Sequence, residues 1–141
     1  MELQFMKKYD NFLACLAILK KADFDHADED EIYRTGIIGQ FNLTFELAWK
    51  ALQETLQLHS VTNADTGSPR EILKLAYQTG FLKNADVWLL MLKKRNLSVH
   101  IYNENDIDEL IILIRDSFVP AFYELADTLK EKSDELNDNS Y

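Results

Sequence analysis

The chain has 141 residues, a length that favours one domain with one hydrophobic core. Its apolar fraction is 47% and its charged fraction is 28%, which excludes a mostly disordered chain. Four glycines and two prolines are too few for the turns of a β-sandwich or a Rossmann domain, so long helices are expected. The single cysteine, Cys15, excludes an internal disulfide framework and a cysteine-rich zinc site, and indicates a reducing compartment.

The formal net charge is −9, and it is distributed unevenly along the chain. Residues 103–141 carry eleven acidic and three basic side chains, whereas residues 70–95 have a local charge of +4. No basic face is large enough to release many counterions, so we expect no DNA binding, although a small basic site could hold one phosphate. There is neither a signal peptide nor an apolar run of membrane-spanning length, and we therefore expect a cytoplasmic protein without a membrane partner.

The first half of the chain shows two strong helical patterns. Apolar residues at helical spacing predict one helix over residues 3–21 and a second over residues 32–58. Between them, residues 23–31 contain six acids and no base, and we interpret this segment as an acidic loop that leads into the second helix. Residues 59–68 lack periodicity and are rich in turn formers, so they are predicted to be a loop.

The second half predicts three more helices. A short one begins at Ser68-Pro69-Arg70-Glu71, a capping sequence, and ends at Gly80. Asn84 is expected to cap the next, and the last runs from residue 104 to 132 with a kink at Pro120. These elements predict an all-α fold, an antiparallel up-and-down four-helix bundle with one additional short helix. Residues 1–132 would form this single domain, followed by a frayed acidic tail over residues 133–141.

Most of the conspicuous side chains are interpreted as structural. His26 and His59 are expected at the surface rather than as ligands. Trp49 and Trp88 are expected to anchor the core rather than to stack on nucleic-acid bases. Cys15 lies among apolar residues without a local basic activator, which indicates packing rather than nucleophilic chemistry.

Residues 93–102 form the one segment whose composition indicates chemistry. They place Arg95, Asn96, His100 and Tyr102 on about two turns of one helix. Asn96 and His100 share a face, but Arg95 and His100 lie about 140° apart on a regular helix. Either the helix end bends, or each pair converges with a second copy across a dimer, which is the more economical account. The same residues could also be the polar face of an amphipathic helix.

Glu46, on the predicted second helix, is the other charged residue of interest, because it lies within an apolar stretch. It is either a surface charge or the partner of a basic residue, and the sequence leaves both interpretations open.

Arg95, His100 and Tyr102 together have the form R-x4-H-x-Tyr on the penultimate helix of an all-α protein. This pattern resembles the HEPN superfamily of small helical ribonucleases and nucleotide-binding modules. Within it, the chain is similar to the nucleotidyltransferase substrate-binding proteins, also described as the toxin partners of minimal nucleotidyltransferases. The resemblance covers nearly the whole chain and is carried by three stretches, residues 34–52 (RTGIIGQFNLTFELAWKAL), 68–82 (SPREILKLAYQTGFL) and 88–102 (WLLMLKKRNLSVHIY).

The resemblance assigns roles residue by residue. Arg95 and His100 match the family's proposed catalytic pair, and Asn96 matches the polar residue that usually follows the arginine. Tyr102 matches the tyrosine that a cognate minimal nucleotidyltransferase is thought to modify with adenylate. Family members form a two-fold homodimer whose paired R-x4-H helices line a cleft.

Three functions follow as expectations from this resemblance. The first is the toxin of a toxin–antitoxin pair, an endoribonuclease that cleaves RNA without a metal or cofactor and is silenced by the nucleotidyltransferase. The alternative is a non-catalytic substrate-binding subunit of a two-component nucleotidyltransferase. A plain dimeric scaffold with a decayed site is the third.

Overall fold

The structure is a computed structural model that describes residues 2–97 and 103–139, with side chains described for residues 7–95 and 103–137. Within these ranges the chain is helical and contains no strand, which confirms the predicted all-α class. The elements in chain order are α1 (Glu2–Lys20), α2 (Phe24–Ala27), α3 (Glu31–Leu58), α4 (Pro69–Gln78), α5 (Ala85–Leu97), α6 (Glu104–Leu113), the π-helical turn η1 (Ile114–Phe118) and α7 (Val119–Asn139).

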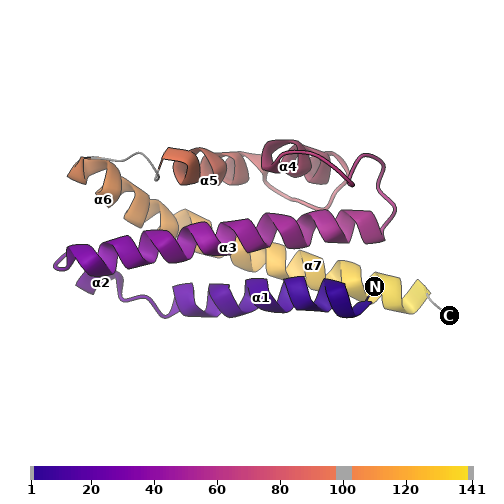
Figure 1. Ribbon diagram of the computed structural model, residues 1–141, viewed down its shortest axis with the longest axis horizontal. Helices are drawn as coiled ribbons and strands as arrows, with labels where there is room; N and C mark the ends of the chain where they lie inside the picture. The colour runs from indigo at the N-terminus through magenta and orange to yellow at the C-terminus, as the bar shows by residue number, and fades with distance from the viewer. Residues whose placement is uncertain (1, 98–102, 140–141) are drawn as a thin grey trace.

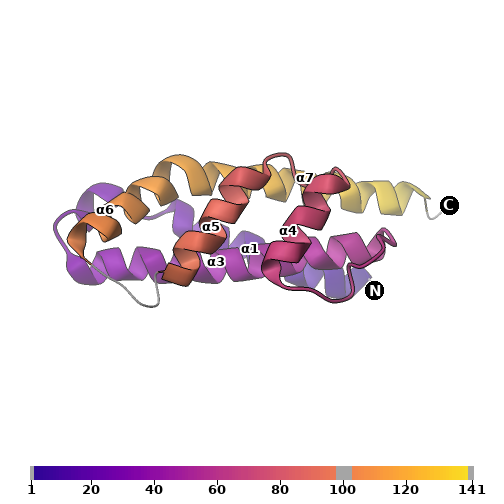
Figure 2. The ribbon, with the colours of Figure 1, turned by 90° about the horizontal axis from the view of Figure 1, so that it is seen from above.

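Four rods alternate in direction along the chain. Helix α1 runs antiparallel to α3. Helices α4 and α5 together also run antiparallel to α3, whereas α6 and α7 run in the same direction as α3 (Figure 1). Helices α1, α3 and α7 pack on one another, while α4 and α5 cross α3 obliquely as a second layer (Figure 2). This order is compatible with the expected up-and-down four-helix bundle, with its third rod divided into two short helices.

The helix ends follow the predicted capping signals. Ser68 and Glu71 form a reciprocal capping box, and Pro69 is the first residue of α4. Gly80 follows the end of that helix with φ +82°, a left-handed conformation that glycine adopts without a steric penalty. The Asn84 side chain accepts hydrogen bonds from two backbone N–H groups at the start of α5. Local sequence therefore sets these boundaries.

Two of the predicted boundaries need correction. The acidic segment expected to be a loop contains the single turn α2, because the Asp23 carboxylate accepts hydrogen bonds from the N–H groups of Asp25 and His26. At the other end of the chain, α7 continues through Asn139, so residues 133–139 of the expected frayed tail are helical. Helix α1 packs alongside α7, with the Tyr9 hydroxyl donating to the carbonyl of Ala126, and α7 extends past the start of α1 (Figure 1).

Pro120 affects its helix in the expected region, and the distortion has a specific form. The predicted helix over residues 104–132 is divided into α6, η1 and α7, and its path bends between α6 and α7 (Figure 1). Proline cannot donate to the carbonyl four residues earlier, and its ring displaces that carbonyl. The N–H of Val119 donates instead to the carbonyl of Ile114, five residues earlier, which is the π-helical pattern.

Aromatic rings from five elements fill the centre of the fold. Phe122 on α7 lies edge-on to Phe12 and Trp88, with ring centroids 6.1 and 5.5 Å away. Phe41 on α3 stacks on Phe118 of η1 at 5.2 Å. Trp88 is 2% exposed and Trp49 is 9% exposed, which confirms both as core residues. This core fixes α5 against α3.

Across the described ranges, none of the helices has the length and apolar character needed to cross a membrane.

Candidate functional site

Arg95 lies in the last turn of α5 and is held by a carboxylate from α3. Its Nη2 lies 2.8 Å from Oε2 of Glu46, and the two side chains are 35% and 28% exposed. The other oxygen of Glu46 lies 3.6 Å from the ammonium of Lys50, one turn further along α3. Glu46 therefore joins two cations, and the interpretation of Glu46 as the partner of a basic residue is confirmed.

The helices on both sides of residues 98–102 are fixed by further ion pairs. Lys94 on α5 lies 3.0 Å from Glu109 on α6. Arg34 on α3, whose side chain is 14% exposed, lies 2.8 Å from Asp108 on α6. The end of α5 and the middle of α6 are thus linked to each other through Lys94 and Glu109. Each is also linked to α3, α5 through Arg95 and Glu46 and α6 through Asp108 and Arg34.

The predicted site residues are only partly described. The structure describes the side chain of Arg95. Of Asn96 it describes only the backbone, which lies in the last turn of α5. His100 and Tyr102 lie outside the described residues. Their convergence with Arg95 therefore stays a prediction, and so does the role of all four residues.

The last turn of α5 carries two cations, and each is paired with a carboxylate, Lys94 with Glu109 and Arg95 with Glu46. Lys94 and Arg95 occupy the last turn of α5, where the helix dipole favours positive charge. Arginine presents five N–H donors in a planar fork, a geometry that matches phosphate oxygens. The contact to Glu46 orients this fork from one side. Among the described side chains, His, Cys, Asp and Glu residues do not form a group of three that could hold a metal ion.

The remaining histidines and the cysteine have structural surroundings. His26 is half exposed and lies edge-on to Tyr33, with its Nε2 atom 3.6 Å from Asp30. His59 is half-buried rather than a surface residue, because its Nε2 atom lies 3.0 Å from the carbonyl of Lys132 and its ring lies against Phe81. Burial raises the pKa of the Cys15 thiol above its ordinary value, which agrees with a packing role.

The sequence did not reveal two buried polar groups on α3. The carboxylate of Glu54, 8% exposed, lies 2.8 Å from the ammonium of Lys8 on α1. The indole N–H of Trp49 is buried and has no hydrogen-bond partner among the described residues. Neither group has a local sequence signal, because each depends on which helix packs against α3.

The comparisons with known proteins concern the whole fold. The model of the family "nucleotidyltransferase substrate binding protein like" matches residues 7–131. The crystal structure of ttk003001694 from Thermus thermophilus is similar to 86% of this chain and 98% of that protein, with a TM-score of 0.66 and 27% sequence identity. None of the curated proteins is similar enough to this chain to count as a match. Because the family model spans α1 to α7, including Arg95 and Glu46, the chain belongs to the nucleotidyltransferase substrate binding protein like family.

Proposed function

We propose that this protein is a HEPN toxin, a homodimeric endoribonuclease that cleaves RNA without a metal ion and is silenced by a cognate nucleotidyltransferase. The observation that carries the proposal is the placement of Arg95. Its side chain is about one third exposed at the end of α5, and Glu46 orients the guanidinium, whose planar fork matches phosphate oxygens. His100 follows five residues later, within the segment whose flanking helices are tied to α3 and to each other.

The chemistry needs only groups that the chain supplies. His100 removes the proton from an RNA 2′-hydroxyl, because imidazole with a pKa near ~6.5 is a suitable base at neutral pH. The oxygen then attacks the adjacent phosphorus and the bond to the 5′-oxygen breaks. The departing 5′-oxygen takes up a proton from water and leaves as a hydroxyl, and a 2′,3′-cyclic phosphate remains. Arg95 stabilises the charge that builds on the phosphate oxygens, and Asn96 orients the phosphate or the imidazole. Single-stranded or looped RNA is the expected substrate, because its backbone can adopt the attacking geometry.

Tyr102 supplies the point of control. It is seven residues from Arg95 in the same segment. Transfer of adenylate from ATP to its hydroxyl forms a phosphodiester bond and releases pyrophosphate and the hydroxyl proton. The added bulk and negative charge then exclude RNA from Arg95 by both steric overlap and repulsion. The name of the family supports a nucleotidyltransferase as the partner that performs this transfer.

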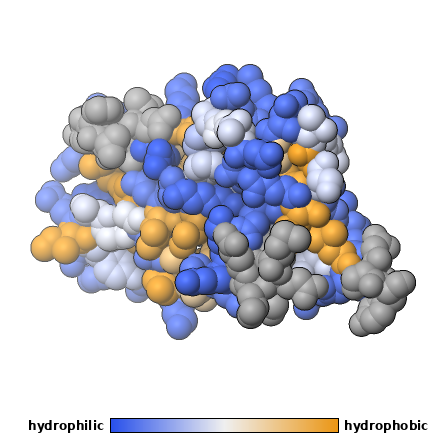
Figure 3. Space-filling view, turned by 45° about the vertical axis from the view of Figure 1, so that its right-hand side comes forward, coloured by the Kyte–Doolittle hydropathy of each residue, from blue (hydrophilic) through white to orange (hydrophobic). Residues whose placement is uncertain are grey.

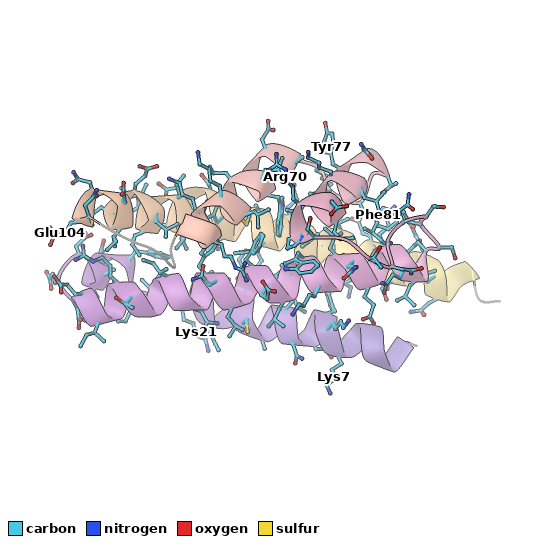
Figure 4. The ribbon with its side chains drawn as sticks, turned by 45° about the horizontal axis from the view of Figure 1, so that its top comes forward. Lys7, Lys21, Arg70, Tyr77, Phe81 and Glu104 are labelled. Carbon is cyan, nitrogen blue, oxygen red and sulfur yellow. The ribbon has the colours of Figure 1, made fainter. Side chains whose placement is uncertain are left out.

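The test is cleavage of single-stranded RNA by the purified dimer in the presence of EDTA. Arg95→Ala should lower the rate about 100-fold or more, and Arg95→Lys should restore little, because an ammonium cannot make the forked contact. The control is Arg70→Ala, which removes an exposed arginine of the same basic region from α4. In Figure 4, Arg70 and Tyr77 lie on the opposite side of the molecule from Lys7 on α1. Equal loss in the Arg95 and Arg70 variants would contradict a site at Arg95.

The second candidate is a non-catalytic subunit that presents substrate to the nucleotidyltransferase. The description of the family favours it directly. It predicts that the chain co-purifies with a nucleotidyltransferase encoded beside it, and that transfer by that enzyme requires this chain. Wild-type protein that cleaves no RNA, with Tyr102 unmodified by mass spectrometry, would select this candidate over the toxin.

A further inference from the structure

Lys50 is the second cation attached to Glu46, and it is held less tightly than Arg95. Its Nζ atom lies 3.6 Å from Oε1 of Glu46, whereas Nη2 of Arg95 lies 2.8 Å from Oε2. The longer distance exceeds that of an ordinary N–H···O hydrogen bond. An ammonium has three N–H donors, and the Lys50 side chain is 48% exposed, so donors remain for a ligand.

The two cations are neighbours, and both are more exposed than the carboxylate between them. Arg95 comes from the last turn of α5 and Lys50 from α3, which α5 crosses (Figure 2). They contact opposite oxygens of one carboxylate, which keeps them close together. The Glu46 side chain is 28% exposed, less than that of Arg95 (35%) or Lys50 (48%). Glu46 neutralises only one of the two charges, so this pair of cations retains a positive charge toward solvent.

The surrounding charges favour one direction for an anionic strand that contacts Arg95. Asp108 on α6 pairs with Arg34 near the start of α3, whereas Lys50 lies beyond Glu46, toward the other end of α3. The exposed acidic side chains of α6 are Glu104, Asp106, Asp108 and Glu109. They repel phosphates, so the strand is favoured to continue along α3 past Lys50. The surface seen in Figure 3 is largely hydrophilic, with apolar residues at separate places, so charge rather than a broad apolar patch directs a ligand over it.

We infer that Lys50 binds the phosphate next to the scissile one, so that the substrate of this site is an RNA strand with two consecutive phosphates. The inference rests on the ribonuclease of the proposed function and adds a second contact to its substrate. Arg95 holds the phosphate that reacts, where its forked contact stabilises the developing charge. The compact charge of an ammonium suits the neighbouring phosphate, which keeps the same shape and charge throughout the reaction.

This division of roles predicts which kinetic constant each cation affects. A contact that is equally strong in the ground state and the transition state lowers KM without raising kcat. The contact of Lys50 with an unreacting phosphate is of this kind, whereas the contact of Arg95 strengthens as the reaction proceeds. Loss of Lys50 should therefore raise KM, and loss of Arg95 should lower kcat.

Calorimetry with uncleavable trinucleotides tests the contact without relying on catalysis. The first probe is a 2′-O-methyl RNA trinucleotide, which has two phosphates, and the second has one of these phosphates replaced by a neutral methylphosphonate. Lys50→Met should raise the Kd of the first probe about 3-fold to 10-fold, because one charge-assisted contact at a partly exposed site is lost. It should leave the Kd of the second probe unchanged, because the remaining phosphate occupies Arg95 and the two losses are not additive.

Two further variants separate this contact from general attraction by positive charge. Lys50→Arg keeps the cation and should bind the first probe as wild type does. Lys93→Met is the matched control, because it removes an exposed lysine of α5 two positions before Arg95 and should leave both Kd values unchanged. Circular dichroism should show the same helical content in every variant. With a cleavable trinucleotide, Lys50→Met should raise KM in the same proportion as Kd and keep kcat within about 2-fold of wild type.

Equal Kd values of wild type and Lys50→Met for the first probe, or an equal loss in Lys93→Met, would overturn the inference. So would a fall in kcat at unchanged KM, because Lys50 would then act only through Glu46 and Arg95. The binding measurements involve no cleavage, so they separate the two proposals. A protein that binds through Lys50 and cleaves nothing supports the phosphate contact and contradicts only the ribonuclease, whereas cleavage that is indifferent to Lys50 contradicts only the contact.

Discussion

The guanidinium of Arg95 and the carboxylate of Glu46 meet at 2.8 Å, although 49 positions separate them in the sequence. This contact joins the last turn of α5 to the middle of α3, and Lys50 lies on the far side of the same carboxylate. Both side chains are partly exposed, so the pair contributes about 1 kcal/mol or less to stability. Its larger effect is on geometry, because it restricts the conformations available to the arginine of the R-x4-H motif.

Glu46→Gln tests this positioning role. The amide can still accept a hydrogen bond but no longer attracts the guanidinium, so Arg95 should sample more conformations. We expect RNA cleavage to slow by about 10-fold to 100-fold, with helical content unchanged. Glu109→Gln is the matched control, because it removes the carboxylate paired with the neighbouring Lys94 and should leave the rate unchanged. Faster cleavage by Glu46→Gln would show instead that Glu46 competes with RNA for Arg95.

The ion pair between Lys8 and Glu54 should matter more for stability than any exposed pair. Lys8→Met leaves the buried carboxylate of Glu54 without its partner. Because the Lys8 side chain is 42% exposed, water can compensate in part, and the expected loss is about 1–2 kcal/mol in the free energy of unfolding. Urea titration measures this loss. Lys7→Met, at the exposed neighbouring position, should cost less than about 0.5 kcal/mol. Equal losses would contradict a specific role for the pair.

Tyr9 predicts how stability changes in alkali. Burial, and then the nearby carboxylates of Asp127, Asp10 and Asp134, raise the pKa of its hydroxyl above 10.0. The neutral hydroxyl also donates to the carbonyl of Ala126. The folded state thus holds the proton more tightly than the unfolded chain. The stability that the protonated Tyr9 hydroxyl contributes to the folded state is fully present below the pKa of tyrosine in the unfolded chain, about 10. It is lost as the pH rises through the higher pKa that Tyr9 has in the folded state.

Urea titrations at pH ~8 and at pH ~10.5, on either side of the ordinary tyrosine pKa, measure this loss. The unfolding free energy of wild type should fall more between the two pH values than that of Tyr9→Phe. Tyr77→Phe should keep the wild-type dependence, because Tyr77 is half exposed. Identical pH dependence in wild type and Tyr9→Phe would contradict the assignment.

Much of the fold could be predicted because its signals are local. The capping box at Ser68 and the cap at Asn84 each set a boundary through side chains adjacent to it. The single turn α2 was missed because four residues are too few to show apolar periodicity. Pro120 indicated where the last helix is distorted, but the π-helical turn before it depends on packing that one proline does not specify.

The candidate site was predictable only in part, for a physical reason. The residue types of the R-x4-H motif lie in one segment and can be read from the sequence. The partner of Arg95 lies on another helix, and its identity depends on how α5 crosses α3, which the aromatic core determines. Likewise, the periodicity of α3 indicates which side is buried, but not that Ile32 and Leu43 remain uncovered.

The most direct test of the central claim is the identity of the ends formed when single-stranded RNA is incubated with this protein in EDTA. Wild type should produce 2′,3′-cyclic phosphate ends, detected by mass spectrometry. His100→Ala should produce none above background, since no other group is expected to remove the proton from the 2′-hydroxyl. Cleavage that depends on an added metal ion, or cyclic ends formed equally by the His100→Ala variant, would contradict the proposed ribonuclease.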